Sequence, residues 1–429
     1  MDGLGADPDP SAGGETVVSF LGTAGVGKSS LINALLAVQA VQAGGEGGPV
    51  TAAPVHLRYG CRSGFAATYR PPSFLWRMTH ALCRLVEPVC PGVSTRLLAR
   101  MRPEVRAELE REETGVWSAP AGVSPGVHAW AERVARRLIF GRPWGVESPA
   151  QLLSGLHRIL GLPEPLPVGF GLQELARMAH IRSLIPYMEE ARPYQVQEGA
   201  PDFDAEYAAH QCGHLAPLVM VLTRQLPAPL LKSGLVIVDQ PGLGIAEDDA
   251  GRSFPTTLPS GRGQAAVLVM DHRGVPDALS GALRTSPLGR LFDATDAANR
   301  PDIPLSLVVT RVDDLVHEEY ARRRDLGEVV PSKRAVFRAH VERLKPLLRE
   351  TLFRQLTHHH AADLTRDGTT VRRRLRRSVD VHVVSAPEFG RVHRADARDR
   401  PFLELEDTGV PGLAAWLAGI SCHGPESPT

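Results

Sequence analysis

Short apolar runs alternate along the chain with stretches of helical spacing. Residues 16–21 form a β-branched and apolar run, which predicts a strand. After a glycine-rich interval, apolar side chains recur at helical spacing, namely Leu31, Ile32, Leu35, Leu36 and Val38. Further strands are predicted at residues 54–59, 234–239, 305–310 and 379–384. This order favours an α/β fold with a predominantly parallel sheet.

The stretch from residue 61 to residue 212 has patterns typical of helices. One apolar stripe consists of Phe74, Leu75, Met78, Leu82 and Leu85, and a second of Trp130, Val134, Arg137 and Leu138. Ser148 and Pro149 then predict an N-cap and a first-turn proline, and Gly161 a C-cap. These stripes favour the core of an inserted helical module over a membrane-binding surface.

Composition limits the class of protein. The 429 residues suffice for about three average domains, or for one α/β domain with an insertion. Lys+Arg and Asp+Glu are equal at 48 each, so no nucleic acid partner is expected. The five cysteines form no CxxC pair, and neither a signal peptide nor an apolar run of roughly 18 residues is present. A soluble, cytoplasmic protein without a transmembrane segment is expected, with peripheral membrane contact left open.

The glycine-rich interval fits a phosphate-binding loop. The segment Gly22-Thr-Ala-Gly-Val-Gly-Lys28-Ser29 satisfies the P-loop pattern GxxxxGK[ST] and lies between a predicted strand and a predicted helix. Its backbone N–H groups would surround the phosphates, Lys28 would neutralise their oxygens, and the Ser29 hydroxyl would bind Mg²⁺. The expected nucleotide contacts here are Gly22, Thr23, Ala24, Gly25, Val26, Gly27, Lys28, Ser29 and Ser30. The alternative is a glycine-rich turn that matches by chance.

Two further elements would complete the metal and γ-phosphate site. The strand at 234–239 ends in a DxPG sequence, so Asp239 would hold Mg²⁺ through water and the Gly242 N–H would contact the γ-phosphate. The alternative is an ordinary Pro-Gly turn after a core strand. Thr51 precedes the strand at 54–59, where a switch threonine would bind both Mg²⁺ and the γ-phosphate.

The end of the strand at 305–310 decides the base. Thr310, Arg311 and Asp313 resemble the [NT]KxD guanine-specificity motif of the small GTPases, with arginine in place of the usual lysine. A carboxylate at Asp313 can accept hydrogen bonds from N1–H and the 2-amino group of guanine, a donor pair that adenine lacks. Ser385 and Ala386 follow the last strand and are similar to the loop that contacts the guanine O6. The alternative is an acidic turn at a strand end.

These motifs together resemble the dynamin-like branch of the P-loop GTPases. A more specific resemblance, to the nuclear GTPase SLIP-GC and its relatives, rests on residues 216–222, 226–227, 234–242, 383–389 and 406–413. It covers about the first 60 residues and nearly everything after residue 200. The expected organisation is a disordered tail at 1–14, a GTPase domain at 15–60 and 213–420, a helical insertion at 61–212 after the second strand, and a disordered tail at 421–429.

The expected activity is hydrolysis of GTP to GDP and phosphate with Mg²⁺, in which Lys28, Thr51 and Gly242 are catalytic. Leu243 stands where small GTPases carry a water-orienting glutamine, and Ala24 and Gly25 cannot replace it. Hydrolysis is therefore expected to be slow alone and stimulated by homodimerisation or by a protein partner that supplies an arginine. Two alternatives stay open: a pseudo-GTPase or nucleotide-dependent binding module with little turnover, and an ATPase.

Overall fold

The computed structural model describes residues 15–43, 53–107, 125–163, 169–242, 264–274, 304–357, 379–394 and 400–422. By their contacts these residues form two compact units. The first contains the described residues up to 63 and those from 223 onward, and the second contains those from 64 to 222.

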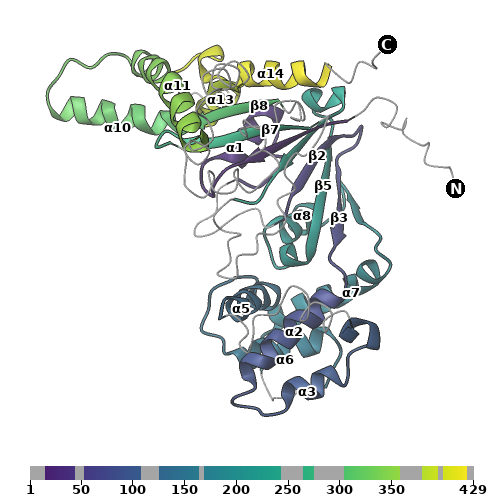
Figure 1. Ribbon diagram of the computed structural model, residues 1–429. Coiled ribbons are helices and arrows are strands. Elements are labelled where there is room, and N and C mark those ends of the chain that lie inside the picture. Colours follow the sequence, from purple (N-terminus) through teal and green to yellow (C-terminus); the bar gives the residue numbers. More distant parts are fainter. Residues whose placement is uncertain are drawn as a thin grey trace, which may run out of the picture. The chain divides into compact units, whose positions relative to one another are not determined.

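The first unit is built on a sheet whose strands follow the order β2–β6–β1–β7–β8–β9 (Figure 1). The strands are β1 (Thr16–Leu21), β2 (Val55–Tyr59), β6 (Leu235–Asp239), β7 (Gln264–Asp271), β8 (Leu305–Thr310) and β9 (Val379–Val383). β1 pairs in parallel with β6 and β7, β7 with β8, and β8 with β9, whereas β2 and β6 are antiparallel. The strands expected from the sequence are confirmed, and β7 is an addition to them.

Apolar side chains fill both sides of this sheet. All six residues of β8 are buried, as are the central residues of β7, as expected for strands covered on both faces. On one side, Met270, Leu307 and Val309 pack with Val316 and Phe337 in a single cluster. This core holds the carboxyl ends of β7 and β8 next to each other.

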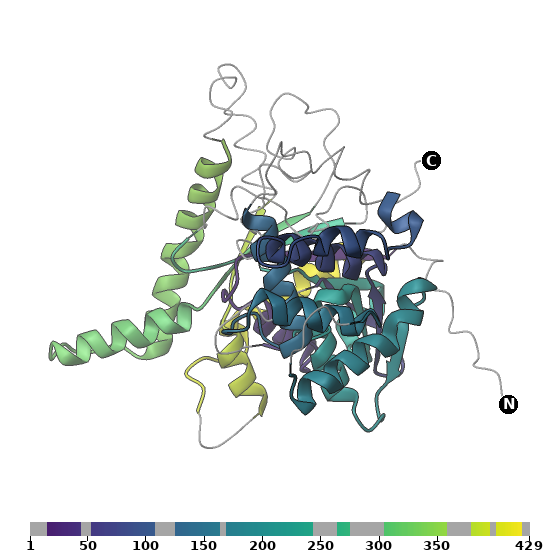
Figure 2. The same cartoon turned by 90° about the horizontal axis from the view of Figure 1, so that it is seen from below.

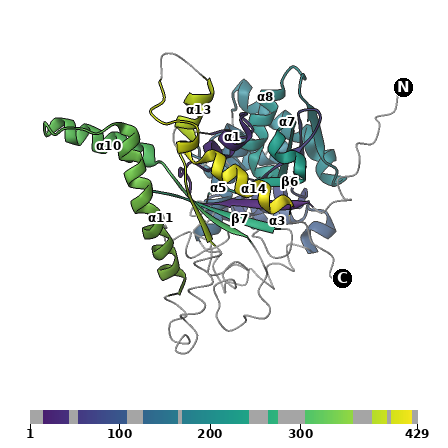
Figure 3. The ribbon, with the colours of Figure 1, turned by 90° about the horizontal axis from the view of Figure 1, so that it is seen from above.

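Helices border the sheet of the first unit in two groups. α1 (Lys28–Leu36) packs against α13 (Ala386–Arg394) and α14 (Val410–Cys422), as Figure 3 shows. α10 (Val312–Asp325) and α11 (Lys333–Thr357) form a helical hairpin, and α11 also contacts β9 (Figure 1). α14 ends at Cys422, whereas the sequence predicted that a tail begins at residue 421.

The first helix is shorter than its apolar spacing suggests. α1 ends at Leu36 because Ala37 adopts a left-handed conformation with φ of 54°. The Asn33 side chain then accepts hydrogen bonds from the N–H groups of Ala40 and Val41 and donates to the Val41 carbonyl. Val38 therefore lies in the turn after the helix, which corrects the expected helix end.

The second unit combines helices with short strands. Its helices are α2 (Ser73–Val86), α3 (Val93–Leu98), α5 (Pro125–Phe140), α6 (Pro149–Ile159), α7 (Leu172–Glu189), α8 (Phe203–Gln211) and the 3-10 turn η2 (Ala216–Leu218). α2, α5, α6 and α7 pack side by side, in dark blue to teal in Figure 2. The helices expected around residues 74–85, 130–138 and 149–160 are confirmed.

Strands also occur in this part of the chain, which was expected to be helical. β3 (Gly64–Tyr69) pairs antiparallel with β4 (Tyr194–Gln197). β5 (Val219–Leu226) lies beyond the expected helical stretch, and the boundary between the two units falls within it. β3 alternates buried and half-buried positions along its last residues, as a strand with one covered face does. The glycine and two alanines in β3 make this alternation weak in the sequence.

Local signals explain where α6 starts and stops. The Ser148 hydroxyl accepts from the Gln151 N–H, and the Gln151 side chain accepts from the Ser148 N–H, which is a capping box. Pro149 occupies the first helical turn, where its missing N–H costs nothing. Gly161 follows the helix with φ of +72°, the left-handed conformation that ends many helices.

A buried hydrogen bond between Tyr69 and His210 lies in the core of the second unit. The two side chains, at the end of β3 and in α8, are joined by a 2.6 Å contact between the tyrosine hydroxyl and Nε2. His210 Nδ1 lies 2.6 Å from the carbonyl oxygen of Glu206, which can only accept, so Nδ1 carries a proton. In the neutral ring Nε2 is then the acceptor, and Tyr69 donates to it.

Within the described ranges, no helix combines the length and the apolar character needed to cross a membrane.

Candidate nucleotide-binding site

The loop between β1 and α1 depends on its three glycines. Gly25 and Gly27 have φ of +76° and +88°, left-handed values that favour glycine, and Gly27 is the N-cap of α1. A Cβ on Gly22 would lie only 2.3 Å from the carbonyl oxygen of Val269 in β7. The glycines therefore allow the chain to leave β1 against β7 and to turn sharply into the helix.

Lys28 closes this loop from the inside. Its Nζ donates to the carbonyl oxygens of Gly22 at 3.0 Å and Thr23 at 3.1 Å, and the side chain is almost fully buried. Burial lowers the pKa of Lys28, and the nearby carboxylate of Asp239 opposes that shift. The loop thus holds an ammonium group with two of its three donors already bonded to the loop backbone.

Asp239 joins the loop from the end of β6. The Ser29 hydroxyl donates to Asp239 Oδ2 at 2.9 Å, and Asp239 is fully buried. The parallel pairing of β1 with β6 sets this contact, because Phe20 is the register partner of Asp239. Two oxygen-bearing side chains, a hydroxyl and a carboxylate, therefore meet at the start of α1.

Gly242 lies against the loop as well. A Cβ on Gly242 would lie 2.8 Å from the backbone nitrogen of Ala24. The backbone of Gly242 therefore comes so close to Ala24 that no side chain fits between them.

Thr310 ties the end of β8 to the same loop. Its hydroxyl lies 2.5 Å from the carbonyl oxygen of Val26 and 3.0 Å from that of Met270. A hydroxyl has one proton, so it donates to one carbonyl at a time. The nearest atoms to a Cβ on Gly27 would also belong to Thr310, at 3.8 Å.

Asp313 and Ser385 meet beyond the ends of β8 and β9. The Ser385 hydroxyl donates to Asp313 Oδ1 at 3.1 Å, and both side chains are buried. Burial raises the pKa of Asp313, while hydrogen bonds from its own backbone N–H and from Ser385 oppose the rise. Ser385 also precedes α13, whose first residue is Ala386. The parallel pairing of β8 with β9 brings these distant segments side by side.

Arg311 links β8 to α10 in a conformation that is rare for a side-chain-bearing residue. Its φ is 59°, and its Nε donates to Asp314 Oδ2 at 2.8 Å. The Arg311 carbonyl lies 3.1 Å from His272 Nδ1, which must donate. His272 follows β7, and because β7 was not predicted from the sequence, His272 was not among the expected site residues.

Comparisons with known proteins give only distant likenesses. The sequence matches no protein-family model and no curated protein. The fold is similar to structures of an oligomerised bacterial dynamin pair associated with long-range sensing and tethering of membranes. One match has a TM-score of 0.43 and 13% sequence identity, and it covers 94% of this chain and 37% of the other. A second match has a TM-score of 0.41 and 12% sequence identity, and it covers 96% of this chain and 45% of the other. This chain spans less than half the length of those chains.

Thr51, an expected ligand of Mg²⁺ and of the γ-phosphate, lies outside the described residues, as does Leu243, which was not expected to contribute. Ser30 is exposed in the first turn of α1. The other expected residues lie in three places: the loop after β1, the end of β6 and the ends of β8 and β9.

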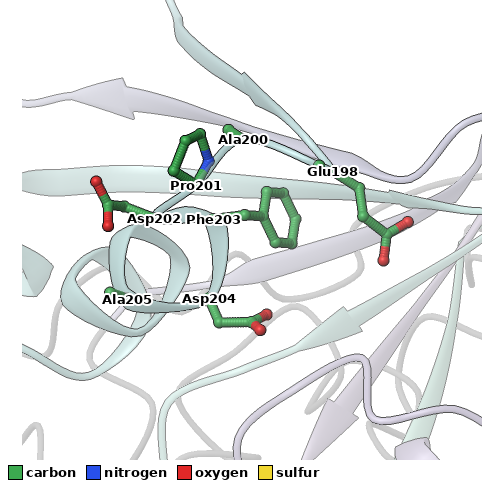
Figure 4. A pocket seen from close by; sticks show the side chains of 8 residues that line it. Glu198, Ala200, Pro201, Asp202, Phe203, Asp204 and Ala205 are labelled. Atoms are coloured by element: carbon green, nitrogen blue, oxygen red, sulfur yellow. The ribbon is translucent and has the colours of Figure 1, made fainter.

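A hollow in the second unit contains none of the expected residues. It is lined by Glu198, Gly199, Ala200, Pro201, Asp202, Phe203, Asp204 and Ala205. Figure 4 shows that the carboxylates of Glu198, Asp202 and Asp204 point in different directions. Over the part of the chain that the structure describes, no three His, Cys, Asp or Glu side chains are grouped so that they could hold a metal ion.

Proposed function

We propose that the chain binds guanine nucleotides with Mg²⁺ and hydrolyses GTP to GDP and phosphate, as a dynamin-like molecular switch. The observation that carries the proposal is the loop from Gly22 to Ser29 between β1 and α1, with the Ser29 hydroxyl bonded to Asp239 at its base. A GxxxxGK[ST] sequence in a strand–loop–helix context is the arrangement that phosphate binding requires. The proposed phosphate contacts are Gly22 to Ser30.

The residues at the base of the loop fit a magnesium ion. Mg²⁺ prefers hard oxygen ligands, and the Ser29 hydroxyl and the Asp239 carboxylate supply two, with Thr51 as the proposed third. When bound, the ion neutralises charge on the phosphate oxygens. Lys28 has a third N–H that is free to reach a phosphate oxygen after its bonds to Gly22 and Thr23. Gly242 would direct its N–H at the γ-phosphate.

The base would lie at the ends of β8 and β9. Asp313 is proposed to accept hydrogen bonds from N1–H and the 2-amino group of guanine. The Ala386 backbone N–H is proposed to donate to O6, because the Ser385 N–H is bonded to the carbonyl oxygen of Thr408. The burial of Asp313 supports this role. A buried carboxylate is stabilised most by two hydrogen-bond donors, and adenine would leave it without them at the largest cost in binding free energy. Arg311 would offer a planar surface beside the base. An ATPase is the competing proposal for the same pocket.

Intrinsic hydrolysis of GTP is proposed to be slow. Ala24 and Gly25 are exposed on the loop and carry no group that can orient water. We therefore propose slow intrinsic turnover, raised by homodimerisation or by a partner that supplies an arginine, an effect of about 10³ to 10⁵ in rate. The same observation favours the second candidate, a pseudo-GTPase or nucleotide-dependent binding module in which GTP orders the switch segments with little turnover.

Single-turnover hydrolysis separates these two candidates. Purified protein in excess over GTP, with Mg²⁺, should release phosphate faster than Lys28→Ala does, because Lys28 would stabilise the charge on the transferring phosphate. Lys232→Ala is a matched control, since Lys232 lies in the turn η3 (Pro229–Ser233) and should leave the rate unchanged. Tight GTP binding with the same phosphate release in wild type and Lys28→Ala would favour the binding module.

The remaining features of the proposal follow the sequence resemblance. They are a GTPase domain at residues 15–60 and 213–420, an insertion at 61–212, a tail at 1–14 and the likeness to the SLIP-GC group. The lack of nucleic acid partners is proposed on the balanced charge, and a cytoplasmic location on the five cysteines without a CxxC pair, a pattern that does not indicate a disulfide framework.

A further inference from the structure

Ser385 is held in place by a segment that none of the sequence motifs assigned to the site. Its backbone N–H donates to the carbonyl oxygen of Thr408 at 2.9 Å, and Thr408 is fully buried in the 3-10 turn η5 (Glu406–Thr408). Gly409 follows with φ of +74°, and a Cβ there would lie 2.0 Å from the carbonyl oxygen of Val383. The turn η5 thus lies directly against the end of β9, and its position fixes that of Ser385.

Asp407 anchors η5 to the start of α11. Its carboxylate accepts from Arg334 Nε at 2.5 Å and from Arg338 Nε and Nη2 at 3.0 and 2.8 Å. The carboxylate is only 14% exposed. Burial disfavours its charge, but the hydrogen bonds from Arg338 and Arg334 outweigh this and hold the pKa of Asp407 below its usual range. Asp407 is therefore a charged anchor between two helical segments.

These contacts close into a ring through the helical hairpin. α10 carries Asp313 in its first turn, and α11 follows α10 and carries Arg334 and Arg338 in its first two turns (Figure 1). Asp407 joins α11 to η5, and Ser385, held by η5, donates to Asp313. A change in the distance between α11 and η5 would therefore alter the contact between Ser385 and Asp313, in the site proposed to recognise the base.

We propose that Asp407 is a positioning residue for base recognition, which holds Ser385 against Asp313 by fixing η5 to Arg334 and Arg338. This inference rests on the proposed function. Without the anchor, η5 can shift, and both the Asp313 carboxylate and the backbone at Ser385 lose their fixed geometry. The loop after β1 is not a member of the ring, so its phosphate contacts are retained.

The test compares nucleotide preference in matched variants. Asp407→Asn keeps the shape of the side chain and removes its charge. Glu404→Gln is the control, because Glu404 also pairs with Arg334 but is exposed. Dissociation constants for GTP and ATP with Mg²⁺, measured by calorimetry, should show GTP binding weakened about tenfold in Asp407→Asn and ATP binding nearly unchanged. The control should keep the wild-type preference, and Asp407→Glu should restore part of it.

The outcomes are distinguishable. Wild type without any preference for GTP over ATP would refute the proposed function, and this inference with it. A wild type that prefers GTP, with an equal preference in Asp407→Asn, would overturn this inference alone, as would equal weakening of GTP and ATP. If Asp407→Asn does not fold, Arg338→Ala tests the inference instead, because the Arg338 side chain is 58% exposed and Arg334 still pairs with Asp407. The preference for GTP over ATP should then fall by a smaller factor than expected for Asp407→Asn.

Discussion

Gly22→Ala should disrupt the loop through a single steric contact. The added Cβ would lie 2.3 Å from the carbonyl oxygen of Val269, whereas ordinary contacts of this kind begin near 3.4 Å. The oxygen belongs to the backbone and the Cβ is fixed rigidly to the Cα of residue 22. Because β1 and β7 are also paired up to Leu21 and Leu268, no flexible side chain can move aside. The strands must separate at this point, which is an overpacking cost of about 1 to 3 kcal/mol.

Gly419→Ala is the matched control for this substitution. Gly419 lies in α14 with open space around a Cβ, so the change should stabilise the protein by about 0.5 to 1 kcal/mol. Urea unfolding followed by circular dichroism should therefore give opposite signs for the two variants. Nucleotide affinity should fall in Gly22→Ala and stay unchanged in Gly419→Ala. Equal stability of Gly22→Ala and wild type would refute the close approach of the loop to β7.

Three further results are expected. Tyr69→Phe should lower the free energy of unfolding by about 1 to 3 kcal/mol, because the buried Nε2 of His210 loses its hydrogen-bond donor. Tyr59→Phe, at an exposed tyrosine, should lower it little. Equal losses would refute the hydrogen bond from Tyr69 to His210. Burial lowers the pKa of His210 to about 4 from 6.5, so below pH 6.5 the unfolded chain binds more protons than the folded one. The free energy of unfolding should therefore fall by about 3 kcal/mol for this residue as the pH drops from 6.5 to 4. An unfolding free energy that does not change with pH in urea titrations would contradict this. Ser29→Ala should weaken GTP binding in Mg²⁺ more than in EDTA, because only the hydroxyl ligand is removed; the same loss in both buffers would count against Ser29 as a metal ligand.

Helices with a clear apolar stripe and apolar runs that end in motif residues could be predicted from the sequence. α2 and α5 are examples of the first kind, and β1 and β8 of the second. β7 is equally apolar, but no motif follows it, and it was missed. β3 was missed for another reason: Gly64 and its two alanines weaken the alternation that distinguishes a strand.

Contacts between distant segments were beyond the reach of the sequence. The approach of Gly22 to Val269 and of Thr310 to Val26 depends on the register of parallel strands, which no local pattern encodes. The anchor at Asp407 likewise requires α11 and η5 to meet, although Arg334 and Asp407 are 73 positions apart in sequence. Sequence reasoning identified candidate chemistry at strand ends, and the fold determined which of these residues touch.

The most direct test of guanine-nucleotide binding is a calorimetric titration of the purified protein with GTP and with ATP, each with Mg²⁺. GTP should bind clearly more tightly than ATP, because the buried carboxylate of Asp313 is satisfied by guanine and not by adenine. Asp313→Asn should remove most of this preference while leaving ATP binding unchanged. Equal affinity of the wild-type protein for both nucleotides, or no binding of either, would contradict the proposed guanine-nucleotide site.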